Sequence, residues 1–171
     1  ENWTYKAVYK VVEAHSEGDN IILANNKCEC CHGKILALKR ESEKSACISD
    51  FVSPEKDYVG VFATSVNVEN ILTTLREQGR EYDAMLLQLF ADRLAEALSV
   101  WQYEKVKQQW GVENMIRPAV GYSCLPNHSL KQDLLELLEN KIDITLTETG
   151  AMMPVSSVCG LYISNSKAKY F

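Results

Sequence analysis

The feature that most constrains the fold is one long helical pattern in the middle of the chain. Over about residues 80–109, apolar side chains recur at the three- and four-residue spacing of a helix. They are Tyr82, Met85, Leu86, Leu89, Leu94, Ala97, Leu98 and Trp101. A shorter helix is predicted before it, capped by Asn67, running to about Gln78 and stopped by Gly79.

Strand patterns lie on both sides of these helices in the sequence. Alternating or β-branched segments predict strands at 5–12, 21–25, 35–40, 46–52 and 57–64, and later at 143–148 and 158–164. A turn at 17–20 joins the first two as a hairpin. A short helix at 130–140 begins with a predicted capping box of Ser129 and Gln132. Strands, then helices, then strands indicate an α+β fold with an antiparallel sheet, and 171 residues fit one domain.

Composition narrows the function classes. A net charge of −5 argues against a nucleic-acid surface, and no apolar run approaches the roughly 18 residues of a membrane span. No signal peptide opens the chain and the cysteines resemble reduced thiols, so we expect a cytoplasmic location. The glycine-rich phosphate motifs and the G-x-S-x-G nucleophile elbow do not occur in the sequence.

The segment CECCH contains Cys28, Cys30, Cys31 and His32, residue types that can bind zinc. A usual zinc site draws on two separated pairs of ligands, and the sequence offers no second pair. A hairpin turn with free thiols is therefore the favoured interpretation, with a reactive cysteine as a further alternative, and we predict no metal site.

Two carboxylates, Asp92 and Glu96, are four residues apart and share one face of the long predicted helix. They lie beside Met85 and Leu89 at the edge of the predicted apolar arc, and Arg93 falls inside that arc. Burying an unpaired carboxylate is costly, so each must be paired or must line a cavity. The sequence leaves open a salt bridge around Arg93 and a polar pocket wall.

The stretch RPAVGYSCLPNH (117–128) is predicted to be an irregular loop, because two prolines exclude a helix and strand alternation is lacking. Arg117 precedes Pro118 and so has an extended backbone, from which its guanidinium can hold a carboxylate or phosphate. Gly121 permits close approach of a ligand, and Tyr122 offers an aromatic face. A surface loop with a structural arginine would use the same residues.

This loop resembles the R-P-A-x-G-Y-x-x-x-P loop of the activation (reactivation) domain of cobalamin-dependent methionine synthase. Further blocks are similar to that family in the same order: EGDNI (17–21), DFVSP (50–54), DYVGVFAT (57–64), FADRLAEA (90–97), LTETGAMMPVSSVCGLYIS (146–164) and SKAKYF (166–171). The resemblance implies a twisted antiparallel sheet with helices packed beside it and a shallow groove for S-adenosylmethionine. It also implies docking on the cobalamin-binding domain of the synthase, where a flavodoxin-type reductant and the methyl donor restore methylcobalamin from cob(II)alamin.

The resemblance also implies roles for residues of the groove. Arg117 matches the arginine that holds the ligand carboxylate, and Ala119 and Gly121 match backbone that lies along the ligand. Tyr122 matches a tyrosine beside the ligand, and Glu96 a helix carboxylate that reaches the ligand ammonium through water.

At the margins of the groove, Tyr170 and Phe171 match an aromatic pair at its end. Asp92 matches a helix carboxylate that meets the cobalt-ligating histidine of the partner domain, and His128 a histidine near the docking face. The chain is expected to contribute no covalent nucleophile, and its chemistry would be positioning and electrostatics.

The amino-terminal pattern departs from the family. The family usually opens with a helical segment carrying an Asp-Trp-Thr-Pro-Phe-Phe motif, whereas Asn2-Trp3-Thr4 runs directly into the first predicted strand. We therefore expect residues 1–171 to form the activation-like domain without that segment. The alternative function is a docking or scaffold domain for a corrinoid methyltransferase that has lost S-adenosylmethionine binding.

Overall fold

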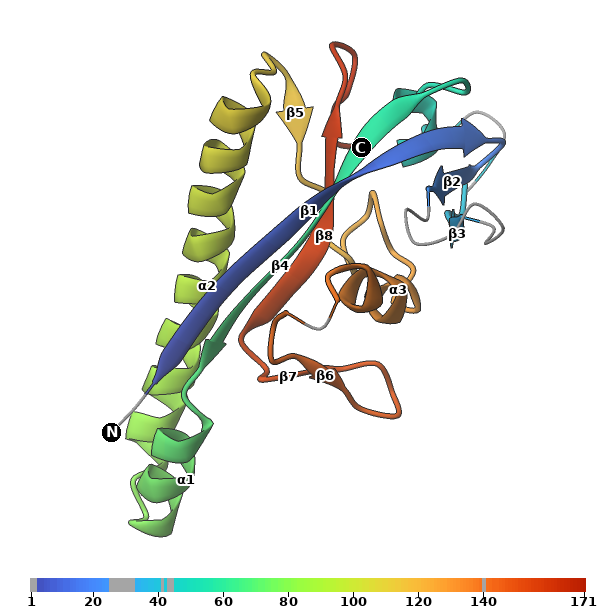
Figure 1. The fold of residues 1–171 in the computed structure, drawn as a ribbon. Coiled ribbons are helices and arrows are strands. Elements are labelled where there is room, and N and C mark those ends of the chain that lie inside the picture. The colour runs from blue at the N-terminus through green and yellow to red at the C-terminus, as the bar shows by residue number, and fades with distance from the viewer. Residues whose placement is uncertain (1–2, 25–32, 41, 43–44, 140) are drawn as a thin grey trace.

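A computed structural model describes residues 3–24, 33–40, 42, 45–139 and 141–171 (Figure 1). Its centre is a six-stranded antiparallel sheet in the order β3-β2-β1-β4-β8-β5. The strands are β1 (Thr4–Glu17), β2 (Asn20–Leu23), β3 (Lys34–Ala37), β4 (Asp57–Asn67), β5 (Met115–Ile116) and β8 (Ser157–Ser164). A separate hairpin pairs β6 (Thr145–Leu146) with β7 (Met152–Met153). The predicted α+β class with an antiparallel sheet is confirmed.

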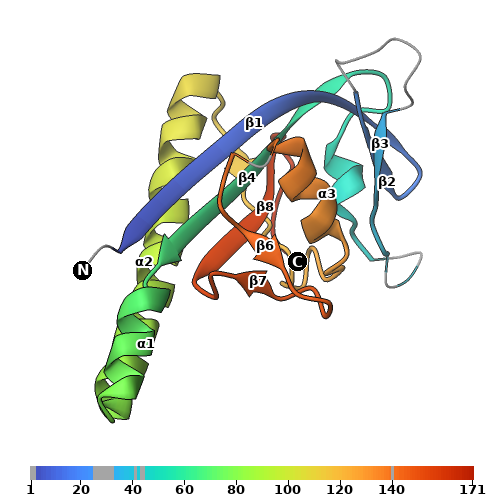
Figure 2. The same ribbon diagram turned by 60° about the horizontal axis from the view of Figure 1, so that its bottom comes forward.

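Helices cover both faces of this sheet (Figures 1 and 2). They are α1 (Glu69–Glu77), α2 (Glu81–Trp110), α3 (Leu130–Leu137) and the 3₁₀ helix η1 (Ile48–Phe51). Alternate residues of β4 point to opposite faces. Phe62 packs in the cluster that contains the buried residues of α2, whereas Val61 and Ala63 pack in the larger cluster that contains those of α3.

The predicted strand at 46–52 is wrong, because its centre forms η1. Asp50 explains the difference. Its carboxylate accepts a hydrogen bond from the Cys47 N–H at 2.9 Å and two from the Arg40 guanidinium at 3.0 and 2.6 Å. These local bonds hold the backbone in a turn while Ile48 and Phe51 remain buried.

The predicted capping box of α3 is also wrong. Ser129 occupies the N-cap position, but its side chain makes no capping bond. The Asn127 side-chain oxygen instead accepts hydrogen bonds from the N–H and hydroxyl of Ser129, at 3.1 and 2.8 Å. Gln132 donates to Glu136 along the helix. Asn67 stands one residue before the N-cap of α1, where its side chain accepts the N–H of Glu69 at 3.1 Å.

The buried face of α2 differs from the predicted apolar arc. Met85 is 60% exposed, Leu89 53% and Trp101 57%. The buried positions of the helix are mostly small: Ala84, Ala91, Ala95, Ser99, Gln102 and Val106. Small side chains let a helix axis approach a sheet closely, and the bulky apolar residues then face outward.

We predict that replacing Ala95 with Leu lowers the free energy of unfolding by about 1–3 kcal/mol, because the added carbons have no space between α2 and the sheet. Leu86→Ala, at a position that is 43% exposed, is the matched control and should change it by less than about 0.5 kcal/mol. Urea denaturation of both variants measures the difference. Equal effects would contradict the packing described.

Candidate functional site

The 117–128 loop leaves β5 and crosses directly over β8. Pro118 O accepts a hydrogen bond from the Leu161 N–H, and the Val120 N–H donates to Cys159 O, both at 2.9 Å. Gly160 makes this crossing possible, since a Cβ there would lie 2.2 Å from Pro118 O. The glycine in β8 therefore brings the start of the loop toward α2.

A tight turn follows at Gly121, whose φ of +100° is a conformation that favours glycine. Its N–H donates to Leu125 O at 2.9 Å, and a Cβ there would lie 3.0 Å from the His128 ring. The structure thus places Gly121 and His128 against each other. Neither is among the residues that line the hollow described below.

Arg117 contacts side chains from several elements. Its Nη1 donates to Ser99 Oγ at 2.5 Å, and its Nη2 lies 3.8 Å from Glu96 Oε2. The guanidinium carbon lies 5.7 Å from the Phe62 ring centroid, and the side chain is only 18% exposed. The Arg117 backbone N–H donates to the Tyr170 hydroxyl at 2.8 Å. The charge is therefore nearly buried and oriented by α2 and the carboxyl-terminal segment.

A hollow of about 240 Å³ opens beside this guanidinium. The residues that line it are Glu96, Arg117, Pro118, Ala119, Tyr122, Ser123, Cys124 and Tyr170. Five of the sequence-predicted groove residues are therefore brought together. The lining thus combines an anion and a cation with two tyrosines that are each more than half exposed.

Asp92 lines a neighbouring hollow of about 350 Å³, which shares Glu96 with the first. Asp92 Oδ1 accepts hydrogen bonds from Ser156 Oγ at 2.6 Å and from Gln88 Nε2 at 2.8 Å. Glu96 pairs with Arg117, and the structure shows no salt bridge to Arg93 among the residues it describes. The arrangement favours the pocket-wall interpretation of the two helix carboxylates.

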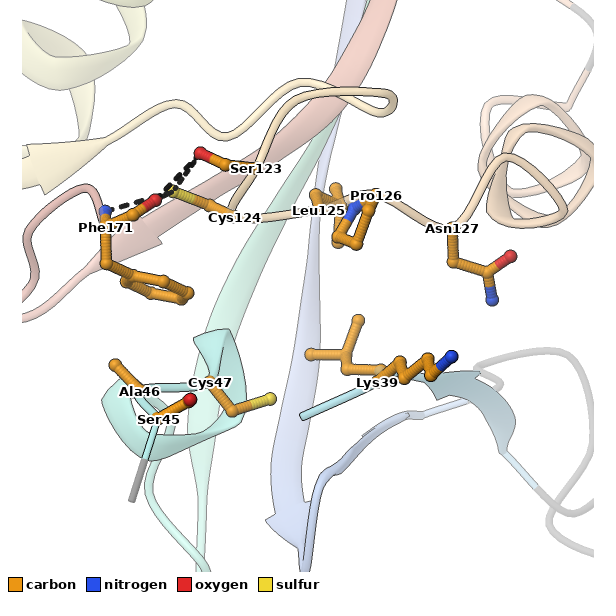
Figure 3. Close-up of a pocket in the computed structure, with 11 residues that line it drawn as sticks. Lys39, Ser45, Ala46, Cys47, Ser123, Cys124, Leu125, Pro126, Asn127 and Phe171 are labelled. Atoms are coloured by element: carbon orange, nitrogen blue, oxygen red, sulfur yellow. Dashed lines mark hydrogen bonds between the residues drawn. The ribbon is translucent and has the colours of Figure 1, made fainter. Parts of the chain in front are cut away.

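Phe171 lies on a third, smaller hollow of about 80 Å³, which Cys47 also lines (Figure 3). Ser123 Oγ and Cys124 Sγ donate to Phe171 O at 2.8 and 3.0 Å, and the Phe171 N–H lies 3.2 Å from Cys124 Sγ (Figure 3). Phe171 is thus outside the lining of the hollow beside Arg117. Its backbone contacts anchor the segment that brings Tyr170 to that hollow.

The electrostatics of the site centre on Glu96. The Tyr122 hydroxyl donates to Glu96 Oε1 at 3.1 Å. The negative charge of Glu96 raises the pKa of Tyr122, and this hydrogen bond and partial burial raise it further, whereas Arg117 opposes the shift. Tyr122 is therefore a neutral donor at physiological pH.

The cysteine segment at 28–32 lies outside the described residues. Within the described part of the chain, no group of three or more His, Cys, Asp or Glu side chains is placed to hold a metal ion. The helices formed by the described residues include none that is long and apolar enough to cross a membrane.

Sequence reasoning missed three residues that contact the predicted ones. Ser99 lies three residues after Glu96, and Gln88 lies four before Asp92, so helical spacing offered a signal for both. Ser156 reaches Asp92 from a segment 64 residues away, and no local pattern in the sequence marks that contact.

Comparison with known proteins decides the family. A sequence model described as "Vitamin B12 dependent methionine synthase, activation domain" matches residues 1–171. The chain belongs to this family of activation domains. A solved structure titled "Crystal Structure of the MetH Reactivation Domain bound to AdoHcy" matches with a TM-score of 0.87 and 29% sequence identity.

That alignment covers 99% of this chain and 61% of the solved chain, so the chain spans about three fifths of the length of its relative. The expected membership of the activation-domain family is confirmed, and the solved reactivation domain has the same fold.

We predict that Glu96→Gln lowers the pKa of Tyr122, because the negative charge that disfavours the phenolate is then absent. NMR titration of ¹³Cζ-labelled tyrosine measures it, with Tyr122→Phe to assign the signal. An unchanged Tyr122 pKa would show that the two side chains do not interact in solution.

Proposed function

We propose that this activation domain binds S-adenosylmethionine in the hollow beside Arg117. The observation that carries the proposal is the convergence of a near-buried guanidinium, a carboxylate and two tyrosine rings on one opening. The related reactivation domain is bound to AdoHcy, which is S-adenosylmethionine without its transferable methyl group. The proposal extends that ligand class to the present chain.

The chemistry of the hollow fits an amino acid joined to a nucleoside. Arg117 would hold the ligand carboxylate, since a guanidinium matches a carboxylate with two parallel N–H donors. Glu96, which lines the same hollow, would face the ligand ammonium. Tyr122 and Tyr170, 59% and 60% exposed, would provide faces for the flat adenine ring.

We further propose that the face around Asp92 docks on the cobalamin-binding domain of the synthase. Ser156 and Gln88 both occupy Oδ1 of Asp92, and the described residues give Oδ2 no hydrogen-bond donor. Leu89 and Val155 flank it with exposed apolar surface, as at many protein interfaces. Docking roles for His128 and for a flavodoxin-type reductant remain predictions.

In this proposal bound S-adenosylmethionine would give its methyl group to cobalamin of the partner domain after a one-electron donor had reduced that cobalamin, and S-adenosylhomocysteine would remain as the product. The chain's own residues would hold the donor at its amino-acid end and shield it beneath the docked face. The domain would raise the rate of methyl transfer by positioning the donor and by electrostatic stabilisation from fixed charges. We also propose that residues 1–171 together form this ligand-binding domain.

We predict that Arg117→Ala weakens binding of S-adenosylmethionine by at least about 30-fold, because the ligand carboxylate loses a charged hydrogen-bond partner. Calorimetric titration measures it, and circular dichroism confirms that the variant is folded. Arg80→Ala is the matched control, since that side chain is 55% exposed and pairs only with Asp83 among the described residues. Equal binding by the wild type and Arg117→Ala would refute the assignment.

A wild-type protein that binds no S-adenosylmethionine but associates with an isolated cobalamin-binding domain would instead support the scaffold alternative. Surface plasmon resonance with the cobalamin-binding domain immobilised separates these two outcomes.

A further inference from the structure

Ser99 lies at the contact between α2 and the arginine of the site. It is fully buried, with an exposed fraction of 0%, and it follows Glu96 by three residues. Its hydroxyl donates to the Glu96 backbone oxygen at 2.7 Å. A serine hydroxyl has one proton, so its oxygen is left to accept the Arg117 Nη1–H at 2.5 Å.

The other two contacts of the guanidinium, with Glu96 and Phe62, do not fix its orientation. Glu96 Oε2 lies 3.8 Å from Nη2, which is too long for a hydrogen bond. The Phe62 face attracts the positive charge but does not fix the rotation of the guanidinium plane above the ring. Among the described residues, Ser99 therefore supplies the one hydrogen-bond acceptor that sets the direction of the Arg117 N–H groups.

We propose that Ser99 is a positioning residue that gives this site its selectivity for ligands with a carboxylate. By binding Nη1, it keeps the guanidinium from closing onto Glu96 and leaves the remaining N–H groups for the ligand. The inference rests on the proposed function and adds a residue to it. Without Ser99, Arg117 and Glu96 would form a close ion pair, and a ligand carboxylate would compete with Glu96 for the guanidinium.

Two ligands separate this role from a purely structural one. S-adenosylhomocysteine has the amino-acid carboxylate, whereas decarboxylated S-adenosylhomocysteine keeps the nucleoside, the sulfur and the ammonium but lacks the carboxylate. Ser99→Ala removes a single oxygen atom. The expected result is roughly tenfold weaker binding of S-adenosylhomocysteine, with the affinity for the decarboxylated ligand unchanged within about twofold.

Ser49→Ala is the matched control, because Ser49 is also buried, at 2% exposed, and its hydroxyl has no hydrogen-bond partner among the described residues. It should change neither affinity. Thermal melting establishes that each variant is folded. If Ser99→Ala does not fold, Ser99→Cys preserves the shape with a weaker acceptor, and it should show the same carboxylate-dependent loss to a smaller degree.

The outcomes distinguish the two proposals. A wild type that binds both ligands, with Ser99→Ala binding both as tightly or losing both equally, would overturn the role of Ser99 and leave the binding site standing. A wild type that binds neither ligand would overturn both proposals. A loss confined to the carboxylate-bearing ligand would support both.

Discussion

The arrangement of the site depends on how one guanidinium is buried. Arg117 places a permanent positive charge against the Phe62 ring with its side chain only 18% exposed. A charge in that position needs hydrogen-bond acceptors and an opposite charge close by, or its loss of hydration would oppose folding. Ser99 and Glu96, one turn apart on α2, supply these two partners. The helix and the loop are thereby tied together at the rim of the hollow.

Two features of the fold bring these groups within reach of each other. Small residues on the buried side of α2, among them Ala91 and Ala95, let the helix lie close to the sheet. Ser99, which is on the same buried side, can therefore contact the arginine. On the sheet side, Gly160 leaves room for the backbone at Pro118 to cross β8. The geometry of a charged site is thus set by positions that carry little or no side chain.

The sequence predicted the order of the main elements well, because long periodic or alternating runs dominate there. β4 and α2 are examples. Prediction was poorer where local hydrogen bonds override a strand propensity, as at Asp50 in η1. It was also poorer at the contact between α2 and the sheet, where small side chains are buried in place of large apolar ones. The exposed Met85 and Leu89 show the second case, since periodicity identified the helix but not which face it buries.

Some residues of the candidate site could likewise be predicted from the sequence, and others could not. The residue types of the 117–128 loop and the spacing of Asp92 and Glu96 indicated the participants, and the structure places Arg117 beside Glu96. Gly121 was expected beside the ligand and His128 near the docking face, and their contact with each other depends on a turn that the sequence did not specify. Ser156 reached Asp92 only through folding, so its part could not be predicted from neighbouring residues.

A crystal structure of this protein with S-adenosylhomocysteine bound would test the role of Arg117 most directly. We expect the ligand carboxylate to meet the free edge of the Arg117 guanidinium while Nη1 stays on Ser99 Oγ. A ligand carboxylate that lies away from Arg117, or an arginine that has left Ser99 to reach it, would refute this role.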